Sequence, residues 1–183
     1  SCCGGCAGVG LAGAETVVRV VRTHGDVLDG LMTGVGRKWL LLHVVHDLNL
    51  CGLTAVRLSD VRRVKIDRSG HDVVIRSLRQ RGLVPSAAVD TKLDRTTDVL
   101  ADLQSRGTLL TIHPEHRWPG TCHLGTVTNI DADRKRFHFL EVSPSAVWDE
   151  AATVWRFRDV RRIDISDPYA EALAAVAGPP PPR

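Results

Sequence analysis

Two segments of this chain, 99 residues apart, have similar sequences, and this duplication limits the folds available to the chain. Residues 57–67 read RLSDVRRVKID and residues 156–166 read RFRDVRRIDIS, with six of the eleven positions identical. Leu58 is replaced by Phe157 in the second copy, so this position stays apolar. A match at a fixed separation indicates two copies of one supersecondary unit. We therefore expect two halves of similar structure.

Short strands are expected in the same order in both halves. Thr16–Arg22 alternates between apolar and polar side chains, and Gly or Asp residues mark turns between strands. The run Trp39–Leu42 is nearly continuous in apolar residues, as expected of a strand buried on both faces. A Gly-Val pair at 34–35 precedes the basic turn 36–38, and Gly125 with Val127 precedes the turn 131–135. We expect strands at Thr16–Arg22, Val27–Val35, Trp39–Val45, Leu53–Leu58 and Val64–Ile66, and then at Thr108–His113, Cys122–Asn129, Phe137–Val142, Thr153–Phe157 and Ile163–Ile165.

Five short strands in a row are typical of a small, strongly bent barrel, which removes exposed sheet edges by closing on itself. The sequence therefore predicts a mostly β protein with two five-stranded barrels that are joined and capped by short α-helices. Asp60 and Asp159 are expected to cap a single helical turn before the last strand of each barrel. The predicted order is a tail (1–14), a first barrel (15–69), a helical connector (70–107), a second barrel (108–167), a C-terminal helix (168–178) and a Pro-rich tail (179–183).

Three helices are expected from apolar spacing and from the residues at their ends. The first two cover residues 72–81 and 97–106, and each is followed by a glycine that can end it. The third begins with Asp167 as N-cap and Pro168 at the first position, and runs to Ala177. Their amphipathic pattern predicts that they cover a barrel end or the interface between the barrels.

The Gly-x-Val strand, the apolar run Trp39–Leu42 and the Asp-Val-Arg-x-Val-x-Ile element resemble those of Sm-like and SH3-like small barrels. From about Thr16 to Ala177 the chain is similar to an uncharacterised bacterial family of tandem barrels, to which the loop at 143–150 and the helix segment Tyr169–Leu173 also correspond. The resemblance implies the fold and no particular activity. RNA-binding Sm-like proteins carry an Ile-Arg-Gly type of element where this chain has AVRLSD at 55–60.

Charge and composition exclude several classes of protein. The formal net charge is only +3, which is far from the excess expected of a strongly basic nucleic-acid binder. Apolar residues make up 43% of the chain, which argues against general disorder, and no apolar run is long enough for a membrane helix. The odd number of cysteines, five, is not typical of a secreted disulfide framework, so a reduced, cytoplasmic setting is expected.

The function predicted from the sequence is non-catalytic binding or scaffolding, with a protein partner or self-association. The loop Trp148-Asp149-Glu150 is a candidate contact, although Trp148 can instead fold back and close a barrel end.

The alternative is RNA or DNA binding through exposed arginines, of which Arg62, Arg63, Arg161 and Arg162 are the proposed contacts. Strand alternation is expected to turn Arg63, Lys65 and their counterparts Arg162 and Asp164 outward. Further candidates are Arg37, Lys38, Arg134, Lys135 and Arg136, with Trp118 and Trp148 as possible stacking residues.

Metal binding is an alternative for one cluster. His113, Glu115, His116, Cys122 and His123 are all of types that zinc accepts, but alternation places Cys122 and His123 on opposite strand faces. The N-terminal Cys2, Cys3 and Cys6 provide three thiols where a structural zinc site normally needs four ligands. The sequence therefore predicts no metal and no cofactor. It also contains none of the usual nucleophile, phosphate-loop or dinucleotide motifs, so no catalytic residue is predicted.

Overall fold

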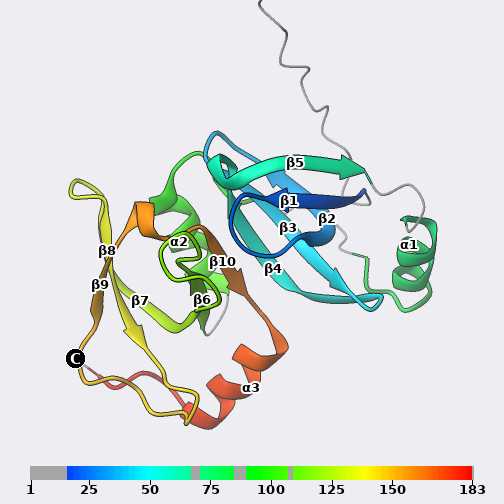
Figure 1. Cartoon of the computed structure of the whole chain (residues 1–183). Helices are drawn as coiled ribbons and strands as arrows, with labels where there is room; N and C mark the ends of the chain where they lie inside the picture. Colours follow the sequence, from blue (N-terminus) through cyan, green and yellow to red (C-terminus); the bar gives the residue numbers. More distant parts are fainter. Residues whose placement is uncertain (1–15, 67–70, 85–89, 107–108, 183) are drawn as a thin grey trace, which may run out of the picture.

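The computed structural model describes residues 16–66, 71–84, 90–106 and 109–182, and the predicted tail at 1–14 lies outside them (Figure 1). The protein is mostly β, as predicted. The first half contains β1 (Val17–Arg22), β2 (Leu28–Val35), β3 (Trp39–His46), β4 (Asn49–Arg57), the 3-10 turn η1 (Leu58–Asp60) and β5 (Val61–Ile66). The second half contains β6 (Leu110–His113), β7 (His123–Asp131), β8 (Arg136–Glu141), β9 (Thr153–Arg156), η2 (Phe157–Asp159) and β10 (Arg162–Ile165).

The ten strands form one antiparallel sheet in which β4 of the first half pairs with β10 of the second. The strand order is β5-β1-β2-β3-β4-β10-β6-β7-β8-β9, so each half contributes its fifth strand, followed by its first to fourth. Val56 lies opposite Arg162 in this joint, and Leu53 lies opposite Ile165. We expected two separate barrels, whereas the pairing of β4 with β10 makes the strands of both halves members of one sheet.

The second strands of the two halves, β2 and β7, deviate from regular pairing at the same place. The register shifts between Met32 and Gly34 in β2, and between Val127 and Asn129 in β7. The skipped residue is a threonine in both strands. The hydroxyl of Thr33 donates to the Leu41 carbonyl (3.2 Å), and that of Thr128 donates to the His138 carbonyl (3.3 Å). A β-bulge bends its strand, so both halves are bent at equivalent positions.

The register also corrects one detail of the predicted alignment. Gly30 in β2 lies opposite Val18 of β1, and Gly125 in β7 lies opposite Leu110 of β6, so these two glycines occupy equivalent positions. The sequence had suggested that Gly34 matches Gly125, but Gly34 aligns with Asn129. A side chain at Gly30 would overlap the carbonyl oxygen of His43 on the neighbouring strand, so close backbone approach explains the glycine.

The main hydrophobic core crosses the joint between the halves. It contains Trp39, Leu41 and Ala55 from the first half together with Ile163 and Phe139 from the second. All four residues of 39–42 are buried, which confirms that this strand is covered on both faces. Burial of this much apolar surface at the joint stabilises the two halves as one unit.

Each α-helix covers a different cluster of apolar side chains. Helix α2 (Thr96–Arg106) packs into the main core, α1 (His71–Gln80) packs against Val17 and Leu31, and α3 (Pro168–Ala177) packs against Leu109 and Val142. The predicted N-cap of α3 is confirmed, because the Asp167 carboxylate accepts from the Tyr169 N–H (3.1 Å) and Pro168 follows it. Among the described residues no helix has the length and apolar character needed to cross a membrane.

Candidate functional site

A pocket of about 580 Å³ lies where segments of both halves meet, next to the joint. Eight of the twelve residues that line it are Lys or Arg, and none of these twelve is acidic. The lining consists of Lys38, Arg57, Arg95, Thr96, Thr97, Ala132, Arg134, Lys135, Arg136, Arg156, Phe157 and Arg158. The chain has 24 basic residues against 21 acidic ones, so this pocket concentrates positive charge that is nearly balanced over the whole sequence.

Equivalent residues of the two halves meet in this pocket. The carbonyl of Lys38, just before β3, accepts from the Leu58 N–H at the start of η1 (2.8 Å). The carbonyl of Lys135, just before β8, accepts from the Phe157 N–H at the start of η2 (2.9 Å). Each hydrogen bond ties a basic hairpin turn to the duplicated segment, so the same local structure places one lysine from each half at the pocket.

Arg57 is the half-buried cation of the pocket, and it reaches across the joint. Its Nε donates to the Val160 carbonyl (3.0 Å), another guanidinium nitrogen donates to the Phe157 carbonyl, and the guanidinium lies 4.8 Å from the centre of the Trp39 ring. Burial and the nearby charge of Arg161 lower the pKa of Arg57 from 12.5 to about 10. Arg57 therefore remains charged at neutral pH, held by carbonyl and aromatic groups without an acidic partner among the described residues.

Most of the other cations in the pocket are free to bind a ligand. Arg134 forms an exposed ion pair with Asp131 (3.4 Å). Within the described part of the chain, no ion pair is formed by the other exposed basic residues of the pocket, which are Lys38, Arg95, Lys135, Arg136, Arg156 and Arg158. Exposed cations without acidic partners keep their full attraction for anions, so the pocket is suited to phosphate or carboxylate groups.

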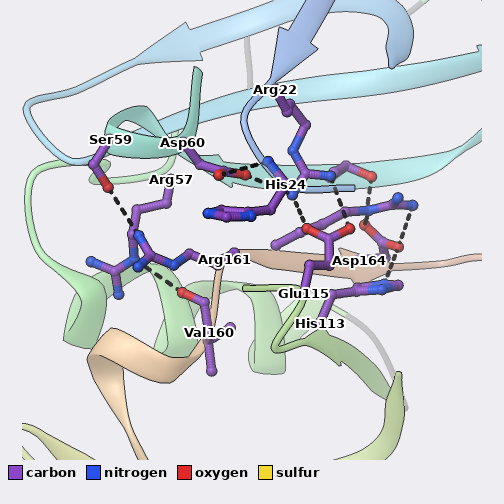
Figure 2. A network of polar contacts seen from close by, with 12 residues as sticks. Arg22, His24, Arg57, Ser59, Asp60, His113, Glu115, Val160, Arg161 and Asp164 are labelled. Atoms are coloured by element: carbon purple, nitrogen blue, oxygen red, sulfur yellow. Dashed lines mark hydrogen bonds and ion pairs between the residues drawn. The ribbon is translucent and has the colours of Figure 1, made fainter. Parts of the chain in front are cut away.

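A separate network of buried charges lies between the halves beside the joint (Figure 2). Arg22 at the end of β1 donates to Asp60 of η1 (3.0 Å) and binds both carboxylate oxygens of Glu115, which follows β6. The side chains of Arg22, Asp60 and Glu115 are no more than 8% exposed. Asp60 also accepts from the His24 N–H (3.2 Å). The prediction that Asp60 and Asp159 cap the helical turns is wrong, because each lies at the end of its turn and neither turn has a side-chain cap hydrogen bond. The Asp60 carboxylate is used in this network instead.

The second part of the network is centred on Asp164 in β10. Its carboxylate accepts from the Thr54 hydroxyl of β4 (2.8 Å), and it contacts His113 (2.8 Å) and Arg162 (2.7 Å). We expected Arg162 and Asp164 to face solvent, as Arg63 and Lys65 do. This expectation is wrong for Asp164, which is 8% exposed, and Arg162 has only 17% of its side chain exposed. Pairing of β4 with β10 covers both residues.

The four arginines proposed as nucleic-acid contacts are not brought together. Arg62 and Arg63 are exposed on β5, which forms one end of the sheet. Arg161 is half-buried at the joint and donates to the Ser59 hydroxyl (3.3 Å), and Arg162 is paired with Asp164. The turn residues Lys38, Arg134, Lys135 and Arg136 do converge on the pocket, whereas Arg57, Arg95, Arg156 and Arg158 were missed. Arg57 and Arg156 open the duplicated segment and are identical in both copies, which is the signal that could have identified them.

The residues considered as zinc ligands have separate partners. His113 contacts Asp164, whereas His123 contacts Glu141 (2.7 Å). Glu115 binds Arg22, and Cys122 is an exposed free cysteine. Among the described residues, no three His, Cys, Asp or Glu side chains are arranged to hold a metal ion. The N-terminal cysteines Cys2, Cys3 and Cys6 lie outside the described residues.

The two candidate stacking tryptophans have different surroundings. Trp118 is 44% exposed and meets Trp155 edge to face, with the ring centres 5.9 Å apart. Trp148 is half-buried, and its indole N–H donates to the Gly178 carbonyl after α3 (3.3 Å). Trp148 therefore folds back onto the end of α3, which was the alternative to its role as a contact. Neither residue lines the basic pocket.

Comparison of this chain with protein-family models, with curated proteins and with solved structures gives no match. The chemistry of the pocket therefore has to be argued from its own residues.

The charge network predicts how stability depends on pH. Burial raises the pKa of Asp164, but the hydrogen bonds and charges of His113 and Arg162 outweigh it and lower this pKa from 3.8 to about 2. A carboxylate whose pKa is lower in the folded state stabilises the fold above its unfolded pKa, here by about 2 kcal/mol. We expect this contribution to be constant near neutral pH and to be lost as the pH falls from about 4 to about 2.

The measurement is urea unfolding of the wild type and of Asp164→Asn over this pH range. The difference in free energy of unfolding should be largest near neutral pH and should shrink below about pH 4. Asp29→Asn is the matched control, because Asp29 pairs with Arg19 on the surface and its removal should cost less than about 1 kcal/mol. A difference for Asp164→Asn that does not change with pH would contradict the prediction.

Proposed function

We propose that this protein is a nucleic-acid-binding protein that holds the phosphate backbone of a single strand in its basic pocket. The observation that carries the proposal is that eight basic residues and no acidic residue line the pocket. Guanidinium groups form paired hydrogen bonds with phosphate oxygens, and six of the eight cations are arginines. Because these basic residues come from several separate segments, they provide enough cations to contact more than one phosphate group of a strand.

An aromatic side chain in the pocket supports a single strand as its ligand. Phe157 lines the pocket and stacks on Phe137, with the ring centres 6.3 Å apart and the ring planes 29° from parallel. An aromatic side chain beside a row of cations is the combination that binds single strands, with phosphates on the cations and a base on the ring. Binding of a protein partner, which the sequence favoured, stays a prediction. An acidic peptide could bind the same cations, but it would not need the aromatic side chain, so Phe157 favours the nucleic acid.

The architecture that we propose for this function is a tandem of two Sm-like or SH3-like barrels. Three observations support it: the same strand order in both halves, the threonine bulges in β2 and β7, and the matching contacts of Lys38 and Lys135. The proposal includes a cytoplasmic setting, which is supported by two free cysteines, Cys51 and Cys122.

The test is a fluorescence-polarisation titration with labelled single-stranded RNA, single-stranded DNA and duplex DNA at about 50 mM and about 200 mM salt. We expect single strands to bind and the affinity to fall steeply with salt, because bound phosphates release counterions. Lys38→Glu/Lys135→Glu should weaken binding by about tenfold or more and reduce the salt dependence. These side chains are exposed, so their replacement should leave the melting temperature nearly unchanged.

Arg62→Glu/Arg63→Glu is the charge-matched control, and it tests the surface that the sequence favoured. If only this control loses binding, the ligand lies on β5 and the pocket proposal is wrong. Absence of binding by the wild type at the lower salt concentration would contradict the function itself. Polyglutamate is the competitor for specificity: if it displaces the strand as well as unlabelled RNA does, the pocket binds anionic chains in general.

A further inference from the structure

The two outer strands of the sheet, β5 and β9, are unpaired on one side within the described part of the chain. β5 pairs with β1 alone, and β9 pairs with β8 alone. Both strands expose apolar side chains: Val64 is 40% exposed, Ile66 is 56% exposed and Val154 is 49% exposed. An open strand edge with apolar side chains is a template for pairing with another chain.

The pairing of β4 with β10 inside the molecule shows which strands of this kind pair with each other. There, the fourth strand of one half (β4) pairs with the fifth strand of the other (β10). The outer edges are the remaining fifth strand (β5) and the remaining fourth strand (β9). A second copy of the chain can therefore repeat the internal joint, with β9 of one copy beside β5 of the next.

The side chains at these edges match those of the internal joint. By the duplicated segment, Val64 and Ile66 align with Ile163 and Ile165, which are at most 1% exposed in the joint. Val154 lies two residues before Arg156, as Ala55 lies two residues before Arg57, and Ala55 is fully buried opposite Ile163. The positions that are buried in the internal joint are therefore apolar and exposed at the outer edges.

Polar groups at the edges also correspond. Across the internal joint, the Arg57 N–H donates to the Arg161 carbonyl (3.0 Å). Arg156 is the counterpart of Arg57 and is exposed. Its backbone N–H can donate in the same way to the Arg62 carbonyl of a second copy. The Thr54 hydroxyl bonds to Asp164 in the joint. The corresponding positions at the outer edges are Thr153 and Lys65, so in the same register the threonine hydroxyl would accept a hydrogen bond from the lysine ammonium group.

We propose that the chain assembles head to tail with copies of itself, through antiparallel pairing of β9 with β5 of the next copy. In the register of the internal joint, Val154 of one copy lies opposite Val64 of the next. The contact joins two different surfaces, so it continues from copy to copy and ends in a closed ring or an open filament. The proposal rests on the strand edges and not on the proposed nucleic-acid binding.

The test measures molar mass by sedimentation velocity over a concentration series, with protein freed of nucleic acid. The molar mass of the wild type should rise with concentration from the 20.0 kDa of one chain to multiples of this value. Val64→Asp blocks one edge and Val154→Asp blocks the other, so each variant alone should remain a monomer. A mixture of the two should form a dimer and nothing larger, because each variant retains one intact edge.

Two controls make the result specific to the edges. Val176→Asp changes an apolar residue of α3 that is 78% exposed, away from both edges, and should assemble as the wild type does. The variant with both edges blocked should remain monomeric in every mixture. Ile66→Asp replaces Val64→Asp if the latter fails to fold. The proposal is overturned if the wild type stays at 20.0 kDa at every concentration, or if the two single-edge variants do not combine.

Discussion

Replacing Arg22 by Met should lower the free energy of unfolding by about 3–5 kcal/mol at neutral pH. Arg22 is fully buried and is the shared partner of Asp60 and Glu115 (Figure 2). Met fills a similar volume but has no charge, so the variant buries two carboxylates without their cation. Removing one partner of a buried ionic group is costly because the charges that remain have lost their hydration. Chemical unfolding monitored by tryptophan fluorescence measures the loss.

Removing one of the two carboxylates as well separates this cause from lost packing, because it relieves the uncompensated charge without restoring the arginine. Adding Glu115→Gln to the Arg22→Met variant should recover part of the stability. Arg19→Met is the matched control, because Arg19 forms an exposed ion pair with Asp29 and its replacement should cost less than about 1 kcal/mol. Equal losses for the two arginines would contradict the interpretation.

Gly125→Ala should destabilise the protein by about 3 kcal/mol, although it adds only one methyl group. Gly125 is buried in β7, and a Cβ atom at this position would overlap the carbonyl oxygen of Leu140 on β8. The overlap is with backbone, which cannot rotate away, so β7 and β8 would have to separate and weaken their ladder. Thermal unfolding followed by circular dichroism measures the effect, and Gly30→Ala should behave in the same way.

Gly82→Ala distinguishes crowding from the cost of backbone conformation. Gly82 has φ of +64° after α1, and a Cβ there would meet no atom within 4 Å. Its replacement should cost about 1 kcal/mol through the left-handed conformation alone. If Gly125→Ala were no more destabilising than Gly82→Ala, the close approach of β7 and β8 would not be what requires glycine.

The sequence determined the order and the approximate limits of the strands and helices. Trp39–Leu42 was expected to be a strand covered on both faces, and Asp167 was expected to cap α3; both predictions are confirmed. These features depend on neighbouring residues, through hydrophobic spacing, turn residues and capping groups, so a single segment contains the information. The convergence of several basic turns on one pocket was not predicted, because it requires the relative positions of segments from both halves.

Only the tertiary structure decided which copy of the duplicated segment lies inside the sheet. The two copies of the segment, which contain β5 and β10, share an Arg-Arg pair and the same spacing of apolar residues, and local alternation predicted that both strands turn charged side chains outward. β5 is an outer strand and Arg63 is exposed, whereas β10 lies between β4 and β6 and Asp164 is buried among His113, Arg162 and Thr54. The physical reason is that the burial of a strand depends on which strands pair with it, and pairing between distant segments is absent from the local pattern.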